Sequence, residues 1–129
     1  MFQFISPNPD SDSKLAYSQG VLTTGQMRTL YVAGQVGVAP DGSVSPSFEG
    51  QVRQAWANVL GVLAASNMEV TDLVKVSAFL TSPDNYAAYA AIRGEFLGDH
   101  KPASTLLVVS ALARPGWMFE VEAIACSQT

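Results

Sequence analysis

Two segments of the chain carry apolar residues at helical spacing. In the first, Ser45 is placed to cap a helix that begins at Pro46, and apolar residues recur every three or four positions: Phe48, Val52, Ala55, Trp56, Val59, Leu60 and Leu63. Ser82 and Pro83 repeat this arrangement before a second helix, which Gly98 ends. The apolar side of the second helix consists of Tyr86, Tyr89, Ala90, Phe96 and Leu97.

The remaining apolar segments have the length and alternation of strands. Their ranges are 16–22, 29–36, 73–80, 104–112 and 117–125. Residues 24–26 form a short polar break suited to a hairpin between the first two, and residues 40–42 form a Pro-Asp-Gly turn. The 104–112 run is almost unbroken in its apolar character, which predicts a strand covered on both faces.

This order of elements predicts an α/β (α+β) sandwich in which both helices cover one face of a mixed sheet. On the 73–80 strand, Val74, Val76, Ala78 and Leu80 share one side. On the last strand, one side carries Trp117, Phe119, Val121, Ala123 and Ala125. The opposite side carries Met118, Glu120, Glu122, Ile124 and Cys126. Since this second face also holds apolar residues, we expect another subunit to cover it.

Composition supports a single oligomeric domain over residues 1–129. Hydrophobic residues make up 48% and charged residues only 14% of the sequence, so a monomer would have few charges to cover its surface. The net charge of −4, with no cluster of basic residues, argues against nucleic acid as a partner. The first ten residues lack a secretory pattern and no apolar stretch is long enough to cross a membrane, so we expect a cytoplasmic protein.

Few residues are suited to catalysis. His100, in a polar segment between helix and strand, is interpreted as a solvated loop residue, and Cys126 has no partner that would make it a metal ligand or a redox pair. No metal site and no phosphate-binding loop is predicted. Glu120 and Glu122 share one strand face, where a partly desolvated carboxylate is suited to proton transfer. The same two acids could equally solvate that face or pair with Lys75.

Several motifs, in order along nearly the whole chain, resemble the RidA/YjgF family, also called endoribonuclease L-PSP or reactive intermediate deaminases. The motifs are Tyr17-Ser18-Gln19-Gly20, Val32-Ala33-Gly34-Gln35, Gln51-Val52-Arg53-Gln54-Ala55 with Asn58-Val59, Asp72-Leu73-Val74-Lys75-Val76, Pro102-Ala103-Ser104-Thr105 and Phe119-Glu120-Val121-Glu122-Ala123-Ile124-Ala125. The resemblance implies a chorismate-mutase-like fold and a homotrimer whose sheets form a central barrel, with small-molecule clefts between subunits.

The resemblance also implies a reaction and site residues. Deaminating members hydrolyse enamines and imines to 2-oxo acids and ammonia without a cofactor. In that correspondence Glu120 positions the attacking water, and Tyr17 and Gly34 line the cleft. Tyr17 fits equally well as a tyrosine that packs at the sheet edge.

The chain departs from the family at the arginine that holds the substrate carboxylate, where Ser104 stands instead. A serine hydroxyl cannot replace the planar fork of a guanidinium, so this sequence indicates a divergent subgroup with weaker carboxylate recognition. Ala90 stands where deaminating members often carry asparagine. Arg53 or Arg114 could supply a cation from another element or subunit.

Two functions of different classes therefore follow from the sequence. The first is a trimeric RidA-like hydrolase acting on a small enamine or imine, which could lack a carboxylate at the usual place. The second is a small-molecule binder or regulatory trimer that has lost deaminase activity, which Ser104 favours. Ribonuclease activity ranks third, because the chain is acidic and lacks a histidine pair.

Overall fold

The structure, a computed structural model, describes residues 2–128. Its elements in chain order are β1 (Phe2–Ile5), α1 (Pro9–Asp12), β2 (Gly20–Thr23), β3 (Met27–Val36), α2 (Phe48–Ala65), the 3-10 helix η1 (Val70–Asp72), β4 (Leu73–Leu80), the 3-10 helix η2 (Pro83–Asn85), α3 (Tyr86–Leu97), β5 (Ala103–Val108) and β6 (Phe119–Gln128).

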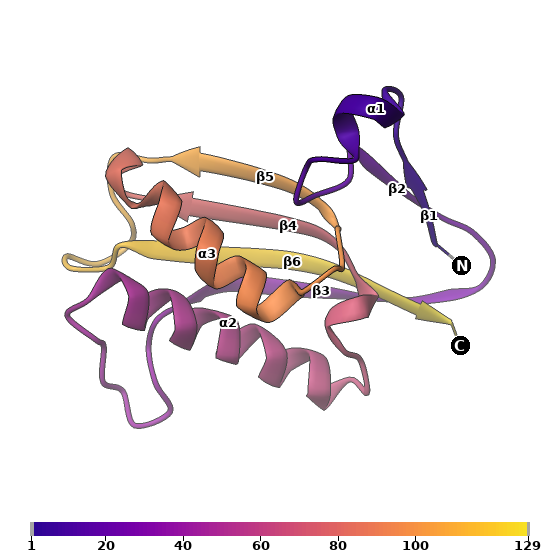
Figure 1. The fold of residues 1–129 in the computed structure, drawn as a ribbon. Helices are drawn as coiled ribbons and strands as arrows, with labels where there is room; N and C mark the ends of the chain where they lie inside the picture. Colours follow the sequence, from indigo (N-terminus) through magenta and orange to yellow (C-terminus); the bar gives the residue numbers. More distant parts are fainter. Residues whose placement is uncertain (1, 129) are drawn as a thin grey trace.

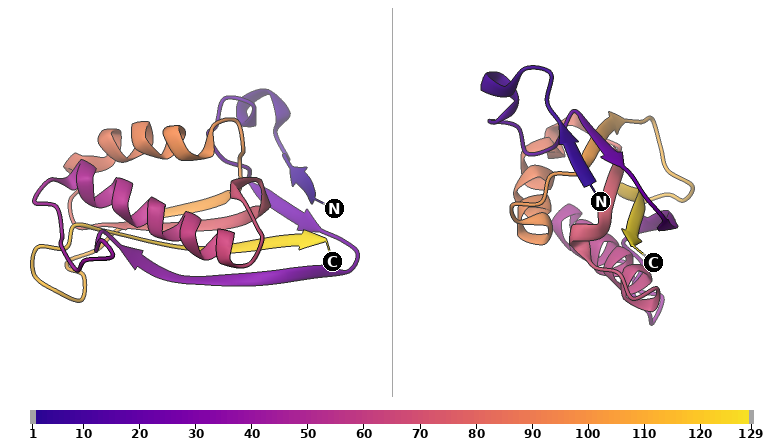
Figure 2. Two further views of the ribbon diagram at one scale, coloured as in Figure 1. Left: turned by 90° about the horizontal axis from the view of Figure 1, so that it is seen from below. Right: turned by 90° about the vertical axis from the view of Figure 1, so that its right-hand side faces the viewer.

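The main sheet has the strand order β3-β6-β4-β5. Strands β4 and β5 are parallel, and the other two pairings are antiparallel. Helices α2 and α3 lie on the same side of this sheet, as the view in the left panel of Figure 2 makes clear. The predicted arrangement of two helices on one face of a mixed sheet is therefore confirmed.

Helix α2 starts two residues later than predicted. Ser47, not Ser45, is the N-cap, and its side chain accepts a hydrogen bond from the Gly50 amide at 3.0 Å. The Ser45 hydroxyl instead accepts from the Ser47 amide at 3.2 Å and so holds the turn before the helix. Proline at position 46 therefore lies outside the helix, because the cap that satisfies the first amides is Ser47.

Helix α3 begins and ends where the sequence indicates. The Ser82 hydroxyl accepts from the Asp84 amide at 3.2 Å, and η2 leads directly into α3. Gly98 ends the helix with a φ of 56°, a left-handed conformation that glycine adopts without a steric cost. The predicted apolar side is wrong at Tyr86, which is 52% exposed, while Ile92 is in the core.

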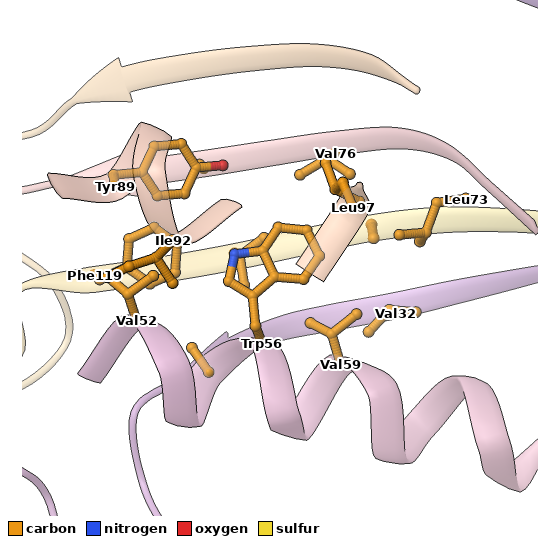
Figure 3. Close-up of a cluster of buried hydrophobic side chains, with 14 of the residues drawn as sticks. Val32, Val52, Trp56, Val59, Leu73, Val76, Tyr89, Ile92, Leu97 and Phe119 are labelled. Atoms are coloured by element: carbon orange, nitrogen blue, oxygen red, sulfur yellow. The ribbon is translucent and has the colours of Figure 1, made fainter. Parts of the chain in front are cut away.

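The core lies between the helices and the main sheet. Trp56 of α2 stacks on Phe96 of α3 with ring centroids 5.8 Å apart. Tyr89 packs against Phe119 of β6, with centroids 5.2 Å apart. Figure 3 shows the side chains of α2 directed toward the strands, with Trp56 at the centre of this cluster. The large aromatic area buried here makes this contact the main stabilising layer of the fold.

The strands confirm most of the predicted faces. Phe119, Val121, Ala123 and Ala125 are buried beneath the helices, whereas Trp117 precedes β6. On β4, a register shift between Leu73 and Lys75 turns Leu73 into the core in place of Val74. The opposite side of β6 is more exposed, apart from Cys126, which is buried inside the strand.

The strand predicted over residues 104–112 is shorter in the structure, while its coverage on both faces, which the sequence analysis assigns in part to another subunit, stays a prediction. Strand β5 ends at Val108 and forms the edge of the main sheet. Leu107 is 50% exposed on one face, and Val108 is 49% exposed on the other. The apolar run reflects surface that the helices of the same chain do not reach.

The predicted hairpin at residues 24–26 is also wrong. Strand β2 pairs with β1, and β3 pairs with β6, so the two strands on either side of Gly25 belong to different sheets. Gly25 has a φ of 85°, which lets the chain change direction between them. Figure 1 shows β1, β2 and α1 as a separate unit near both ends of the chain. The sequence interpretation missed β1, because a four-residue strand carries little periodic signal.

Candidate functional site

Glu120 and Gly34 lie on neighbouring strands and touch. Val36 and Phe79 flank Glu120 in the antiparallel register, and Gly34 falls within the register shift between Val32 and Gln35 of β3. A Cβ atom at position 34 would lie 3.0 Å from Glu120 Cδ and 3.3 Å from Cγ, and would overlap Oε1. The Glu120 carboxylate therefore lies directly over the backbone of Gly34, which has no side chain.

The acids on this face are not neutralised by the chain's own lysine. Lys75 Nζ donates to Thr105 Oγ1 at 2.6 Å, and the one ion pair within residues 2–128 joins Arg53 to Glu95. The interpretation of Glu120 and Glu122 as partners of Lys75 is thus wrong. Glu120 is half-buried and Glu122 is exposed, so Glu120 is the acid in the more sheltered position.

Ser104 lies on the opposite face of the same sheet. It is paired with Val76, which is fully buried beneath the helices. Glu120 is paired with Phe79, an odd number of residues further along β4, and successive residues of a strand point to opposite faces. One chain therefore cannot bring Ser104 and Glu120 to a common ligand.

Tyr17 lies near the start of β5, next to Ser18, which contacts that strand. The Ser18 amide donates to the Pro102 carbonyl at 3.2 Å, and Ser18 forms a bridge with Ala103. Tyr17 is half-buried and lines a surface pocket of about 270 Å³ together with Lys101. Of the four predicted site residues, the structure thus brings Gly34 and Glu120 into contact, while Tyr17 and Ser104 both lie near the start of the edge strand.

The two cations considered as substitutes are engaged elsewhere in the chain. The Arg53 guanidinium is 3.0 Å from the Glu95 carboxylate on the outer surface of the helices. The Arg114 guanidinium lies over the Trp117 ring, 5.8 Å from its centroid, in the loop before β6. Within one chain, neither arginine accompanies Ser104.

His100 differs from the solvated residue that the sequence predicts. Its Nε2 donates to the Leu73 carbonyl at 2.7 Å, and its ring contacts Phe4 edge-on with centroids 6.0 Å apart. His100 is half-buried and connects the N-terminal unit to the start of β4. Its role in the described structure is to hold these segments together.

The described residues contain neither a cluster of metal-binding side chains nor a helix that could cross a membrane. Within residues 2–128 no group of three or more histidine, cysteine, aspartate or glutamate side chains is arranged to bind a metal ion. None of the helices in that range has the length and apolar character needed to cross a bilayer.

Comparisons with known proteins match nearly the whole chain. The family model described as Endoribonuclease L-PSP matches residues 9–127. The human 2-iminobutanoate/2-iminopropanoate deaminase is 31% identical over 111 residues, covering 84% of this chain and 78% of that protein. The RutC family protein YjgH of Escherichia coli (strain K12) is 37% identical over 98 residues, covering 74% of this chain and 73% of that protein.

A solved structure extends this similarity to three dimensions. The crystal structure of YyfB, a protein of unknown function from the conserved Rid family of Yersinia pestis, superposes with a TM-score of 0.84. The two chains are 30% identical, and the superposition covers 98% of each.

Proposed function

Because the chain belongs to the endoribonuclease L-PSP family, which includes the RidA/YjgF proteins, we propose that it is a deaminase that hydrolyses small enamine or imine intermediates. The contact between Glu120 and Gly34 is the observation that carries this proposal. This contact positions a carboxylate that has no cationic partner within its own chain. The carboxylate lies on a sheet face that no helix covers, where a small molecule and a water could lie beside it.

The proposed active form is a homotrimer with a cleft between neighbouring subunits. The face that carries Glu120 has no helices over it, and it exposes Tyr31 by 74% and Leu107 by 50%. Burying these side chains against another copy would remove apolar surface from water. Since Ser104 and Glu120 lie on opposite faces, two chains must contribute to any cleft that contains both. We place this trimer in the cytoplasm.

In the proposed reaction Glu120 removes a proton from a water molecule as that water attacks the C=N carbon. A carbinolamine forms and its nitrogen takes up a proton. The C–N bond then breaks as the hydroxyl group gives up its proton, which releases ammonia and leaves a carbonyl group. An enamine substrate first takes up a proton at carbon and gives up one from nitrogen to become the imine. Gly34 leaves room for the water, while Tyr17 and Ser104 of a neighbouring copy provide hydroxyl groups for the substrate.

The test is ammonia release from 2-iminopropanoate and related imines formed in situ by an amino-acid oxidase. The wild-type protein should accelerate release, and Glu120→Gln should lower kcat about 100-fold or more while the trimer persists. Glu122→Gln is the matched control, since it removes an acid from the same strand at an exposed position. Failure to accelerate hydrolysis of any imine in the panel would reject the deaminase proposal.

A second candidate function is non-catalytic binding of a small metabolite by the same trimer. Ser104 favours it, because the hydroxyl is a weaker anchor for a carboxylate than a guanidinium. A ligand that raises the melting temperature without being consumed would support this function, whereas turnover of that ligand would support the deaminase.

A further inference from the structure

We propose that Ser18 is a positioning residue for the proposed reaction, because it fixes Tyr17 relative to Ser104 of the same chain. This inference rests on the proposed function, in which the hydroxyl groups of Tyr17 and Ser104 bind the substrate. It adds a residue that controls how tightly the substrate is held and that takes no part in the steps where bonds form and break.

Tyr17 lies outside the regular structure of the chain. It belongs to the segment between α1 and β2, and neither a helix nor a strand includes it. Strands β1 and β2 pair with each other in a sheet of their own, so the hydrogen bonds of the main sheet do not place this segment. Figure 1 shows the N-terminal unit beside the start of β5. The location of Tyr17 therefore depends on individual contacts between its segment and the body of the fold.

Ser18, the next residue, makes such contacts with the segment that leads into β5. Its hydroxyl donates to the Lys101 carbonyl at 2.5 Å, and its amide donates to the Pro102 carbonyl at 3.2 Å. It also forms a parallel bridge with Ala103, the first residue of β5. Since Ala103 directly precedes Ser104, Ser18 connects the two substrate-binding residues through a short run of backbone.

The segment that receives Ser18 is itself fixed. Pro102 is fully buried. The His100 amide donates to the Leu97 carbonyl at 3.0 Å, and its ring Nε2 donates to the Leu73 carbonyl at 2.7 Å. These bonds tie the segment to the end of α3 and to the start of β4. A residue that is bonded to this segment therefore takes its position from the body of the fold.

Packing alone does not fix Tyr17. The residue is half-buried and lines the surface pocket of about 270 Å³ together with Ser18 and Lys101. Because this open space lies beside Tyr17, few packing contacts oppose a shift of its segment. The hydrogen bonds of Ser18 are therefore needed to keep the tyrosine hydroxyl in one place.

Other contacts join the N-terminal unit to the same segment at positions further along the chain from Tyr17. Lys101 Nζ donates to the Ser13 carbonyl at 3.3 Å, and the Phe4 ring meets the His100 ring edge-on. These contacts, and the backbone bond of Ser18, survive the loss of the Ser18 hydroxyl. Ser18→Ala should therefore fold with the N-terminal unit attached and with Tyr17 less well fixed.

Ser18→Ala and the matched control Ser43→Ala provide the test. With 2-iminopropanoate, Ser18→Ala should raise KM about 5- to 10-fold and change kcat by less than about 2-fold, because Tyr17 holds the ground and transition states alike and Glu120 is untouched. Ser43→Ala should leave both constants at their wild-type values. The Ser43 hydroxyl also makes a hydrogen bond, to Asp41 Oδ1 at 2.7 Å, but in the turn between β3 and α2.

Ser18→Thr separates positioning from a general loss of structure. Threonine keeps the hydroxyl, so KM should return to within about 2-fold of the wild-type value. If Ser18→Ala does not fold, Ser18→Cys replaces it, and KM should rise by a smaller factor because a thiol is a weak donor. A wild-type KM in the folded variant that lacks the hydroxyl, or no rescue by threonine, would contradict the proposal.

A double-mutant cycle with Tyr17→Phe shows whether Ser18 acts through Tyr17. If it does, adding Ser18→Ala to Tyr17→Phe should raise KM no further, because the hydroxyl that Ser18 positions is already gone. Factors that multiply would show that Ser18 acts independently of Tyr17 and would overturn the proposal.

Hydrogen exchange and ligand affinity separate this proposal from the proposed function. In Ser18→Ala, the protection factor of the amide at position 18 should fall about 5-fold or more, while the amides of α2 keep their wild-type protection. If the wild type releases no ammonia but binds pyruvate, the product of 2-iminopropanoate hydrolysis, the cycle is repeated on pyruvate affinity measured by calorimetry. A non-additive cycle then upholds the role of Ser18 although the deaminase proposal fails. Unchanged protection at position 18, or a wild type that neither releases ammonia nor binds pyruvate, overturns this role.

Discussion

The carboxylate of Glu120 occupies the space that a side chain at position 34 would need. The two residues belong to neighbouring strands, and the irregular register of β3 around residues 33 and 34 sets the backbone beneath the acid. Gly34 therefore determines where the Glu120 carboxylate lies, although it contributes no functional group of its own.

Gly34→Ala should reduce activity with little effect on stability. The new methyl group overlaps Oε1, the far end of a flexible side chain, so Glu120 can rotate away at a cost of less than about 1 kcal/mol in the free energy of unfolding. A carboxylate displaced by about 1 Å loses its alignment with the attacking water, which can lower kcat on the order of 100-fold. Ammonia release and thermal unfolding, measured on the same preparation, check both parts.

Gly37→Ala is the control, and for this variant we expect the loss to be in stability. A Cβ there would lie 2.6 Å from Gln51 Cα and 2.7 Å from its carbonyl oxygen, and this backbone belongs to α2. Helix α2 and the segment after β3 must separate, so we expect a loss of about 1–3 kcal/mol in the free energy of unfolding. Full activity of Gly34→Ala would show that the observed position of Glu120 is not the one used in catalysis.

Leu107→Asp should dissociate the proposed trimer. Leu107 is 50% exposed, and its pairing with Phe79 puts it on the same face as Glu120. A carboxylate buried between subunits without a partner is costly, so the protein should become monomeric at micromolar concentrations and lose the proposed deaminase activity. Sedimentation velocity gives the oligomeric state.

Val44→Asp is the control for this surface, because Val44 is a partly exposed apolar residue in the turn that bridges to Val38. It should leave the sedimentation coefficient unchanged. A wild-type protein that is already monomeric would instead reject the trimer.

The sequence predicts the elements of the main sheet well, because their signals are local. The alternation on β6 separates Phe119 from Glu120 without reference to any other strand. The cap at Ser82 and the stop at Gly98 likewise depend on a few adjacent residues. The predicted start of α2 differs from the observed start by only two residues, because the cap is Ser47 and not Ser45.

The positions of the site residues relative to one another could not be predicted from such local signals. That Ser104 and Glu120 lie on opposite faces depends on how β5 and β6 pair with β4, and strand register is set by long-range packing. Gly34 is marked by its motif, but its contact with Glu120 arises only from the register shift in β3.

Gln51→Ala should destabilise the protein strongly. Gln51 is 2% exposed, and its Nε2 donates to the carbonyls of Ser45 at 3.0 Å and Gly116 at 2.9 Å. Its Oε1 accepts from the Met118 amide at 2.9 Å. Truncation leaves these backbone groups unpaired, so we expect a loss of about 2–4 kcal/mol in the free energy of unfolding.

Chemical denaturation measures this loss, and Gln54→Ala is the control. Gln54 is only half-buried, and its amide donates to the Asn58 side chain of the same helix at 2.9 Å, so its truncation should cost less than about 1 kcal/mol. Equal stability of the two variants would show that water replaces the bonds of Gln51.

Tyr89→Phe should remove a loss of stability that the wild type shows above pH 10. Burial raises the pKa of Tyr89 to about 12, although the positive charge of Arg93 opposes the shift. The unfolded chain gives up this proton near pH 10 and the folded chain keeps it to about pH 12, so the free energy of unfolding falls by about 2–3 kcal/mol across that window.

Since its hydroxyl has no partner among the described residues, Tyr89→Phe should cost less than about 1 kcal/mol at pH 7 and flatten the alkaline decline. Tyr86→Phe, at an exposed position, should retain the wild-type decline, and identical alkaline profiles for all three proteins would contradict the assignment to Tyr89.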